Sequence, residues 1–223
     1  SADVVSSTVP CSTKWMVGTV NSFYIGIIAT VIATALGTLA ALGLSRPHMP
    51  YKGLIMAILI SPMIVPLIIT AAGMFFFYAR INLVYTFTGV ILAHVALATP
   101  FVVITVTATL VGFDMNMVKA AQSLGAKPMR TFFKVIMPLI LPGIISGALF
   151  AFITSFDEVV IVMFMASIDQ LTIPKQMWAG IRQEISPVIL CMATCLVLLS
   201  IFLLTTVELL RRRSEKLRGI KAR

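Results

Sequence analysis

Two adjacent carboxylates, Asp157 and Glu158, stand well inside an apolar stretch of the sequence. A charge at membrane depth costs about 3 kcal/mol or more on insertion scales, so two neighbouring acids there need a reason. One reason is a cation site, in which carboxylates pair with ammonium groups while aromatic rings cover the attached methylenes. Thr154 precedes the pair by one helical turn, and we expect it to share their face.

The same acids also have a structural interpretation. One of them can pair with a lysine or arginine of a partner subunit, or cap a helix end near the outer surface. Adjacent residues of a helix point about 100° apart, so the two side chains need not face one ligand. Because intramembrane ionisable groups are functional by default, we expect at least one acid, and Asp157 first, to line a pathway.

Other kinds of chemistry find little support in the sequence. Cys191 and Cys195 lie four residues apart in an apolar stretch, where cysteine behaves as a small hydrophobe, and with Cys11 they form no metal or redox spacing. His48 and His94 are isolated from each other and from other ligand types. The P-loop pattern of nucleotide-binding proteins is absent from the sequence. We therefore expect no catalytic residue, no metal and no cofactor in this chain.

The composition is that of a membrane protein. Hydrophobic residues make up 59% of the 223 positions and charged residues 11%, and the mean hydropathy is +1.04. A soluble domain carries about a quarter charged residues, so most of this chain must be solvated by lipid or by other apolar helices. The net charge of +9 does not indicate nucleic-acid binding, because seven of the 17 basic residues are concentrated at 211–223.

Five apolar stretches are long enough to cross a bilayer as helices, at 17–44, 53–78, 84–110, 138–166 and 188–210. The fold class that they predict is an all-α polytopic transmembrane bundle. Pro62 and Pro66 should kink or break the second stretch in the middle of the membrane. We divide the chain into an outer segment, 1–16, a transmembrane domain, 17–210, and a basic tail, 211–223.

The distribution of charge orients these spans. The connections at 45–52 and 112–137 carry two and four lysine or arginine residues, and the tail carries seven, whereas the connections on the opposite side carry four in total. The positive-inside bias puts the richer set in the cytoplasm. We therefore expect the N-terminus of this sequence outside and the C-terminus inside, as an odd number of spans requires.

The cytoplasmic connection 112–137 has its own helical pattern. Met117, Ala120, Ala121 and Leu124 lie along one helical face, and Gly125 follows where a helix would end. A second short apolar face follows Pro128. We expect two small helices joined at the glycine, which would serve either as a docking element or as an interfacial helix on the lipid headgroups.

This segment resembles the cytoplasmic signature of binding-protein-dependent ABC importer permeases. The signature is Glu-Ala-Ala, three residues, Gly, nine residues, Ile, one residue and Leu-Pro, and the matching positions are Ala120, Ala121, Gly125 and Pro138. Lys119 replaces the glutamate, and Val135 and Met137 are conservative replacements of the two aliphatic residues. The resemblance implies that the segment is a coupling helix that docks in a groove of an ATPase subunit.

The expected coupling residues are Ala120, Ala121 and Gly125, whose small size permits close packing, together with Leu124 and Lys119. Lys119 inverts the charge of the family's glutamate and is not assigned its contacts.

The resemblance covers about 21–210 and is closest to the spermidine/putrescine type. It rests on short runs in several stretches, namely Ser61-Pro62, Pro100-Phe101-Val102-Val103, Gly112-Phe113-Asp114, Ser155-Phe156-Asp157-Glu158-Val159-Val160 and Thr172-Ile173-Pro174. It implies the type I ABC importer permease fold, which in this type has six spans with both termini inside. Five are visible here, so we expect that the first family span is missing from this sequence.

The implied function is that of a transport subunit in the bacterial inner membrane, moving a small organic cation such as putrescine or spermidine into the cytoplasm. A second permease, two ATPase subunits that bind ATP and Mg²⁺, and a periplasmic substrate-binding protein are the implied partners. Two alternatives stay open. The substrate could be an opine or an amino-acid derivative, or the chain could be a passive channel or a membrane-embedded enzyme.

Two aromatic features are also open to interpretation. The run Phe75–Tyr78 favours an interfacial belt. Trp178 suits either an interfacial anchor or a contact for a delivery protein.

Overall fold

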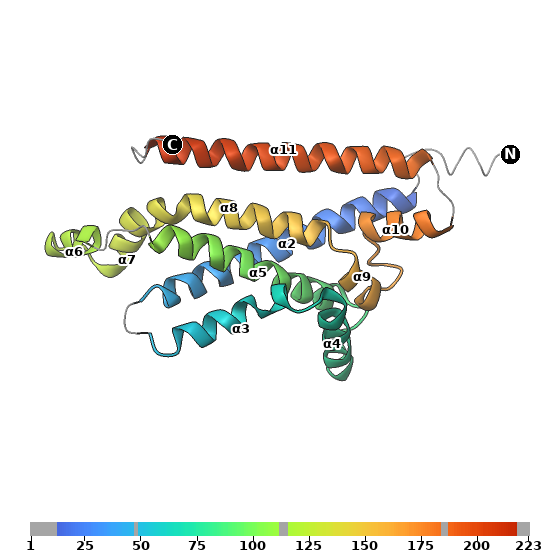
Figure 1. Ribbon diagram of the computed structural model, residues 1–223, viewed down its shortest axis with the longest axis horizontal. Coiled ribbons are helices and arrows are strands. Elements are labelled where there is room, and N and C mark those ends of the chain that lie inside the picture. The colour runs from blue at the N-terminus through green and yellow to red at the C-terminus, as the bar shows by residue number, and fades with distance from the viewer. Residues whose placement is uncertain (1–12, 47–48, 112–115, 184–186, 218–223) are drawn as a thin grey trace.

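Figure 1 shows the computed structural model of the chain, which describes residues 13–46, 49–111, 116–183 and 187–217. All regular elements in these residues are helical. They are α2 (Thr13–Leu44), α3 (Lys52–Ile64), α4 (Leu67–Arg80), α5 (Phe87–Val111), α6 (Asn116–Ser123), α7 (Pro128–Thr131), a π-helical turn η1 (Phe132–Ile136), α8 (Met137–Phe156), α9 (Val160–Met165), α10 (Ile173–Gln183) and α11 (Pro187–Leu217).

The described helices provide up to five membrane spans. Four helical runs are long and apolar enough to cross a bilayer alone, at 14–44, 87–111, 128–156 and 187–206. The pair α3 and α4 forms a fifth candidate, bent by 104° at its break. The predicted all-α polytopic class is therefore confirmed, and the five predicted stretches correspond to these five units.

Proline chemistry explains the bend between α3 and α4. Val65, which precedes Pro66, takes the extended conformation (φ −70°, ψ 135°), because the proline ring disfavours a helical residue before it. Pro66 then stands at the start of α4. The predicted break in the second stretch is confirmed, and it turns α4 away from the direction of α3, so that α4 packs against α9 (Figure 1).

The core is formed by α2, α5 and α8, which lie closely side by side (Figure 1). Small residues allow this approach: Ala29 and Ala33 of α2 are fully buried. At Gly37 of α2, a methyl group would lie 2.6 Å from the Cβ of Val102 in α5 and 3.2 Å from the carbonyl oxygen of Thr99. The spacing of small residues in the first stretch thus has the packing role that is usual in membrane bundles.

We predict that Gly37→Ala lowers the melting temperature of the purified transporter, whereas Gly43→Ala does not. Both glycines lie in α2, but a methyl group at Gly43 meets nothing within 4 Å. Overpacking a tight contact costs about 1–3 kcal/mol, while an alanine in open space favours the helix by about 1 kcal/mol. Thermal unfolding of the two variants measures the difference, and equal melting temperatures would contradict the close packing of α2 on α5.

The structure corrects two details of the sequence interpretation. The fourth stretch, expected to run through 138–166, is interrupted at 157–159, so that Asp157 and Glu158 do not lie within one helix. The physical reason is that the Glu158 carboxylate accepts a hydrogen bond from the backbone of Ile161 and so begins a separate helix, α9. In addition, the region 167–187, expected to be a loop, contains the helix α10.

The two ends of the bundle differ in the elements that they carry. In Figure 1, α6 and α7 lie at the end where α2 finishes and α3 begins, and α11 finishes at the same end. The helices α9 and α10 lie at the opposite end, close to the start of α2. α11 stands to one side of the core, and most of its side chains whose burial is described, which lie within 187–209, are exposed or half-buried.

Candidate functional site

The segment that the sequence predicts to dock on a partner, called the docking segment below, is the pair of short helices α6 and α7 with the turn between them. α6 ends in a pair of hydrogen bonds that satisfies its last carbonyls: the Gly125 amide donates to Gln122 (2.9 Å) and the Ala126 amide donates to Ala121 (3.1 Å). Gly125 has φ +80°, a left-handed conformation that glycine adopts without strain. The expected glycine-linked helix pair is therefore present.

The apolar face of the docking segment is open. None of the residues of α6 is buried, and Leu124, just after its end, is 89% exposed. Lys119 and Ala120 are exposed as well, and Ala121 is half-buried. An exposed leucine beside small residues, on a helix that is too short and too polar to span a membrane, is a surface suited to a protein partner.

The docking segment is joined to the core without an interruption. α7, η1 and α8 form one helical run from Pro128 to Phe156, about 40 Å long at 1.5 Å per residue. The buried Thr131 strengthens its first turn by donating from its hydroxyl to the Lys127 carbonyl oxygen (3.3 Å). The run therefore connects the docking segment directly to the residues that follow Phe156.

The two acids follow this run directly and have different surroundings. Asp157 is the C-cap residue of α8 and its side chain is exposed. Glu158 is only 7% exposed, and its Oε1 accepts a hydrogen bond from the Ile161 amide at 2.9 Å. Thr154, in the last turn of α8, is half-buried. Asp157 is thus free to meet a ligand, whereas Glu158 is engaged with the backbone.

Three phenylalanine rings pack together near the end of α8, where Phe156 directly precedes Asp157, and sequence reasoning missed them as a group. The ring centroids of Phe23 and Phe156 are 5.1 Å apart, those of Phe152 and Phe156 are 5.4 Å apart, and those of Phe23 and Phe152 are 6.2 Å apart. Phe23 comes from α2 and the other two from α8, so only tertiary packing unites them. Phe75–Tyr78, in contrast, lie on α4.

His94 makes a buried contact that was also missed. It lies in α5, is 1% exposed, and its Nδ1 is 2.8 Å from the Ser155 Oγ in α8. The two residues are 61 positions apart, so no local pattern could have paired them. This hydrogen bond fixes the last turn of α8 against α5, two residues before Asp157.

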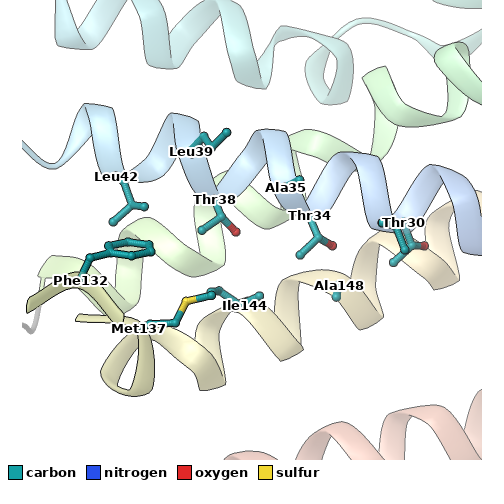
Figure 2. Close-up of a pocket in the computed structure, with 11 residues that line it drawn as sticks. Thr30, Thr34, Ala35, Thr38, Leu39, Leu42, Phe132, Met137, Ile144 and Ala148 are labelled. Carbon is teal, nitrogen blue, oxygen red and sulfur yellow. The ribbon is translucent and has the colours of Figure 1, made fainter. Parts of the chain in front are cut away.

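An apolar groove runs between α2 and α8 (Figure 2). The groove contains a cavity of about 530 Å³, which is lined by Thr34, Thr38, Phe132, Met137 and neighbouring residues. Thr30, Thr34 and Thr38 point from α2 into this space, and Phe132 and Met137 close the end near the docking segment (Figure 2). Because none of its lining residues is acidic, the groove does not have the chemistry of a cation site.

An exposed aromatic residue lies at the end of the bundle opposite the docking segment. Trp178 of α10 is 46% exposed, and the Arg182 guanidinium carbon lies 5.4 Å from its ring centroid. This cation–π pair faces outward from the bundle and leaves both proposed uses of Trp178 open.

The fold defines a class of protein: a polytopic helical membrane protein with an exposed pair of short helices at one end. Residues 13–216 match the family described as binding-protein-dependent transport system inner membrane component. The chain belongs to this family, and it is a permease subunit of the ABC importer type.

Curated relatives of this chain are polyamine permeases. It is 30% identical over 196 residues to the spermidine/putrescine transport system permease protein PotC of Haemophilus influenzae, covering 88% of this chain and 76% of that protein. It is also 30% identical over 181 residues to the putrescine transport system permease protein PotI of Escherichia coli strain K12, covering 78% of this chain and 64% of that protein.

Solved structures of ABC transporters share the fold. An amino acid ABC transporter matches with a TM-score of 0.67 and 18% identity, over 93% of this chain and 97% of that one. The inward-facing MetNI methionine ABC transporter matches with a TM-score of 0.64 and 19% identity, over 92% of this chain and 95% of that one. At these identities the likeness concerns the fold alone.

Proposed function

We propose that this permease takes part in the ATP-driven import of a polyamine, putrescine or spermidine, across the bacterial inner membrane. The observation that carries the proposal is the exposed Asp157 at the end of α8, which directly follows Phe156, a ring that packs on Phe23 of α2. A carboxylate pairs with an ammonium group, and aromatic faces accommodate the methylene stem or attract the charge. The relatives named as spermidine/putrescine and putrescine permeases support the same substrate class.

The proposed assembly contains four further subunits. A second permease encloses the pathway with this one, two ATPase subunits bind ATP and Mg²⁺ and grip the docking segments, and a periplasmic binding protein delivers the substrate. The charge distribution supports a docking segment and a C-terminal tail in the cytoplasm, with α10 on the periplasmic side. ATP binding then closes the ATPases and moves the permeases between inward and outward openings.

This chain's own contribution is mechanical and electrostatic. The docking segment receives the motion of an ATPase through Ala120, Ala121, Leu124 and Gly125, with Lys119 at its edge. The continuous run from α7 through α8 passes the motion to the acid-bearing break. Asp157 and Thr154 there offer polar contacts to the substrate, with the buried Glu158 behind them.

Uptake measurements test this proposal directly. The intact transporter, with its cognate partner subunits, is placed in proteoliposomes with ATP inside, and entry of labelled putrescine and spermidine is followed. We expect ATP-dependent uptake of a polyamine that unlabelled polyamine suppresses and an amino-acid mixture does not. Uptake without ATP, or suppression by amino acids alone, would contradict the proposal.

A further inference from the structure

The short helix α9 is held at both ends by charged side chains. At its start, the Glu158 Oε1 accepts a hydrogen bond from the Ile161 amide at 2.9 Å. At its end, the Lys175 ammonium donates to the carbonyl oxygens of Val162 at 3.2 Å and Ala166 at 3.0 Å. The helix dipole is positive at the N-terminus and negative at the C-terminus, so an acid at the start and a cation at the end both stabilise α9.

α9 needs such support because it has only six residues. An isolated helix of this length is unstable in water, and most of its backbone groups lie in the first or last turn, without helical partners. Its side chains are nevertheless in the core, where Ile161, Val162 and Met165 are fully buried. The Met165 carbonyl oxygen also accepts a hydrogen bond from the Tyr85 amide at 2.9 Å, which ties α9 to the start of α5.

Lys175 comes from α10, whose start is fixed to the outer end of α2. The Ile173 amide donates to the Ser22 hydroxyl at 2.9 Å. The Asn21 side-chain amide donates to the carbonyl oxygens of Asp169 at 2.8 Å and Leu171 at 3.0 Å. The half-buried Lys175 therefore links a firmly held part of the bundle to α9, and this partial burial lowers the pKa of its ammonium.

We propose that Lys175 is a positioning residue for Asp157, acting through α9. Asp157 lies in the three-residue break between α8 and α9, so its place depends on both helices. His94 fixes the α8 side through Ser155, at 2.8 Å, and Lys175 fixes the α9 side through Val162 and Ala166. This inference rests on the proposed function, since it assumes that Asp157 meets the cationic substrate.

The first test compares Lys175→Met with Lys175→Arg in polyamine uptake. Methionine keeps the apolar stem but removes every donor, so α9 loses its C-terminal bonds and no longer positions Asp157. The substrate KM should then rise by about tenfold, the effect of losing one charge-assisted hydrogen bond between Asp157 and the substrate. Arginine retains a charged donor and should restore most of the affinity. Lys14→Met, which removes an exposed charge from the same end of the bundle, should leave KM unchanged.

Uptake is expressed per assembled transporter, so that poor assembly is separated from a changed site. If Lys175→Met accumulates too little complex to assay, Lys175→Leu, which also lacks any donor, takes its place. An unchanged KM per assembled transporter in the donor-free variant, even with lower yield or melting temperature, would mean that Lys175 only stabilises the fold and would overturn the proposal.

A double-mutant cycle with Asp157→Asn gives the second test. If Lys175 acts through Asp157, the loss caused by Lys175→Met should largely disappear when Asp157 is already neutral. Additive losses would refute positioning while leaving Asp157 as a substrate contact. If Asp157→Asn itself has no effect on uptake, the substrate contact in the proposed function fails, and a KM defect of Lys175→Met would then need another route.

Discussion

Leu124→Asp is expected to abolish both uptake and the association of the ATPase subunit. Leu124 precedes the left-handed turn at Gly125 and is 89% exposed. The proposed docking places this side chain in a groove of the ATPase subunit. Burying a leucine side chain contributes about 1.5–3 kcal/mol, and an aspartate in the same cleft adds the larger cost of an unpaired buried charge. Co-purification of the ATPase with the variant permease, and ATP-dependent uptake, measure the effect.

Gln122→Asp is the matched control, because it introduces the same charge on α6. Gln122 is exposed and lies about 200° around the helix from Leu124, away from the predicted docking face. The Gln122→Asp permease should retain its association with the ATPase subunit and most of the ATP-dependent uptake. If Leu124→Asp also retained both, the segment would lie on the membrane surface or in solvent rather than in a partner.

The docking segment was predictable because its signals are local. The apolar spacing of Met117, Ala120 and Leu124 defines one helix face, and Gly125 is the residue type that a left-handed turn requires. In the same way, Pro66 determines the bend between α3 and α4 through its steric effect on Val65, whereas Pro62 lies inside α3 without ending it. Where the chain's own chemistry decides the local conformation, sequence reasoning succeeded.

The break at 157–159 was not predictable by these means. It contains neither proline nor glycine, and apolar residues flank its two acids on both sides. The buried Glu158 carboxylate accepts a hydrogen bond from the Ile161 amide at the start of α9. At the other end of α9, the Tyr85 amide, far away in the sequence, donates to Met165, and Lys175 donates to Val162 and Ala166, thirteen and nine residues before it. The Tyr85 contact depends on tertiary packing, and none of these bonds leaves a periodic pattern in the sequence that would indicate a break.

α10 was missed for a related reason. Its eleven residues are amphipathic and include charged side chains. A short segment of this composition between two membrane spans is hard to distinguish from a polar loop. The helix is fixed by contacts with α2, such as the hydrogen bond of the Ile173 amide to the Ser22 hydroxyl, 151 positions away. Its position therefore reflects tertiary structure more than local propensity.

The two adjacent acids should respond differently to loss of charge. Asp157→Asn is expected to reduce polyamine uptake by about 10- to 100-fold, the effect of losing a charged hydrogen bond worth about 1.5–3 kcal/mol. Glu158→Gln should keep uptake close to that of the parent protein. Its amide oxygen can still accept the hydrogen bond from the Ile161 amide, and at 7% exposure a neutral side chain is no harder to bury.

Glu158→Ala completes the comparison because it removes the acceptor as well as the charge. α9 then loses its N-terminal cap, and the melting temperature of the complex should fall, since losing such a cap costs about 1 kcal/mol. Uptake kinetics and thermal unfolding of the three variants separate the two roles: charge matters at position 157, and the hydrogen bond matters at position 158. If Glu158→Gln instead lost uptake as severely as Asp157→Asn while remaining equally stable, both carboxylates would bind the cation, and α9 would have to move to release Glu158 during transport.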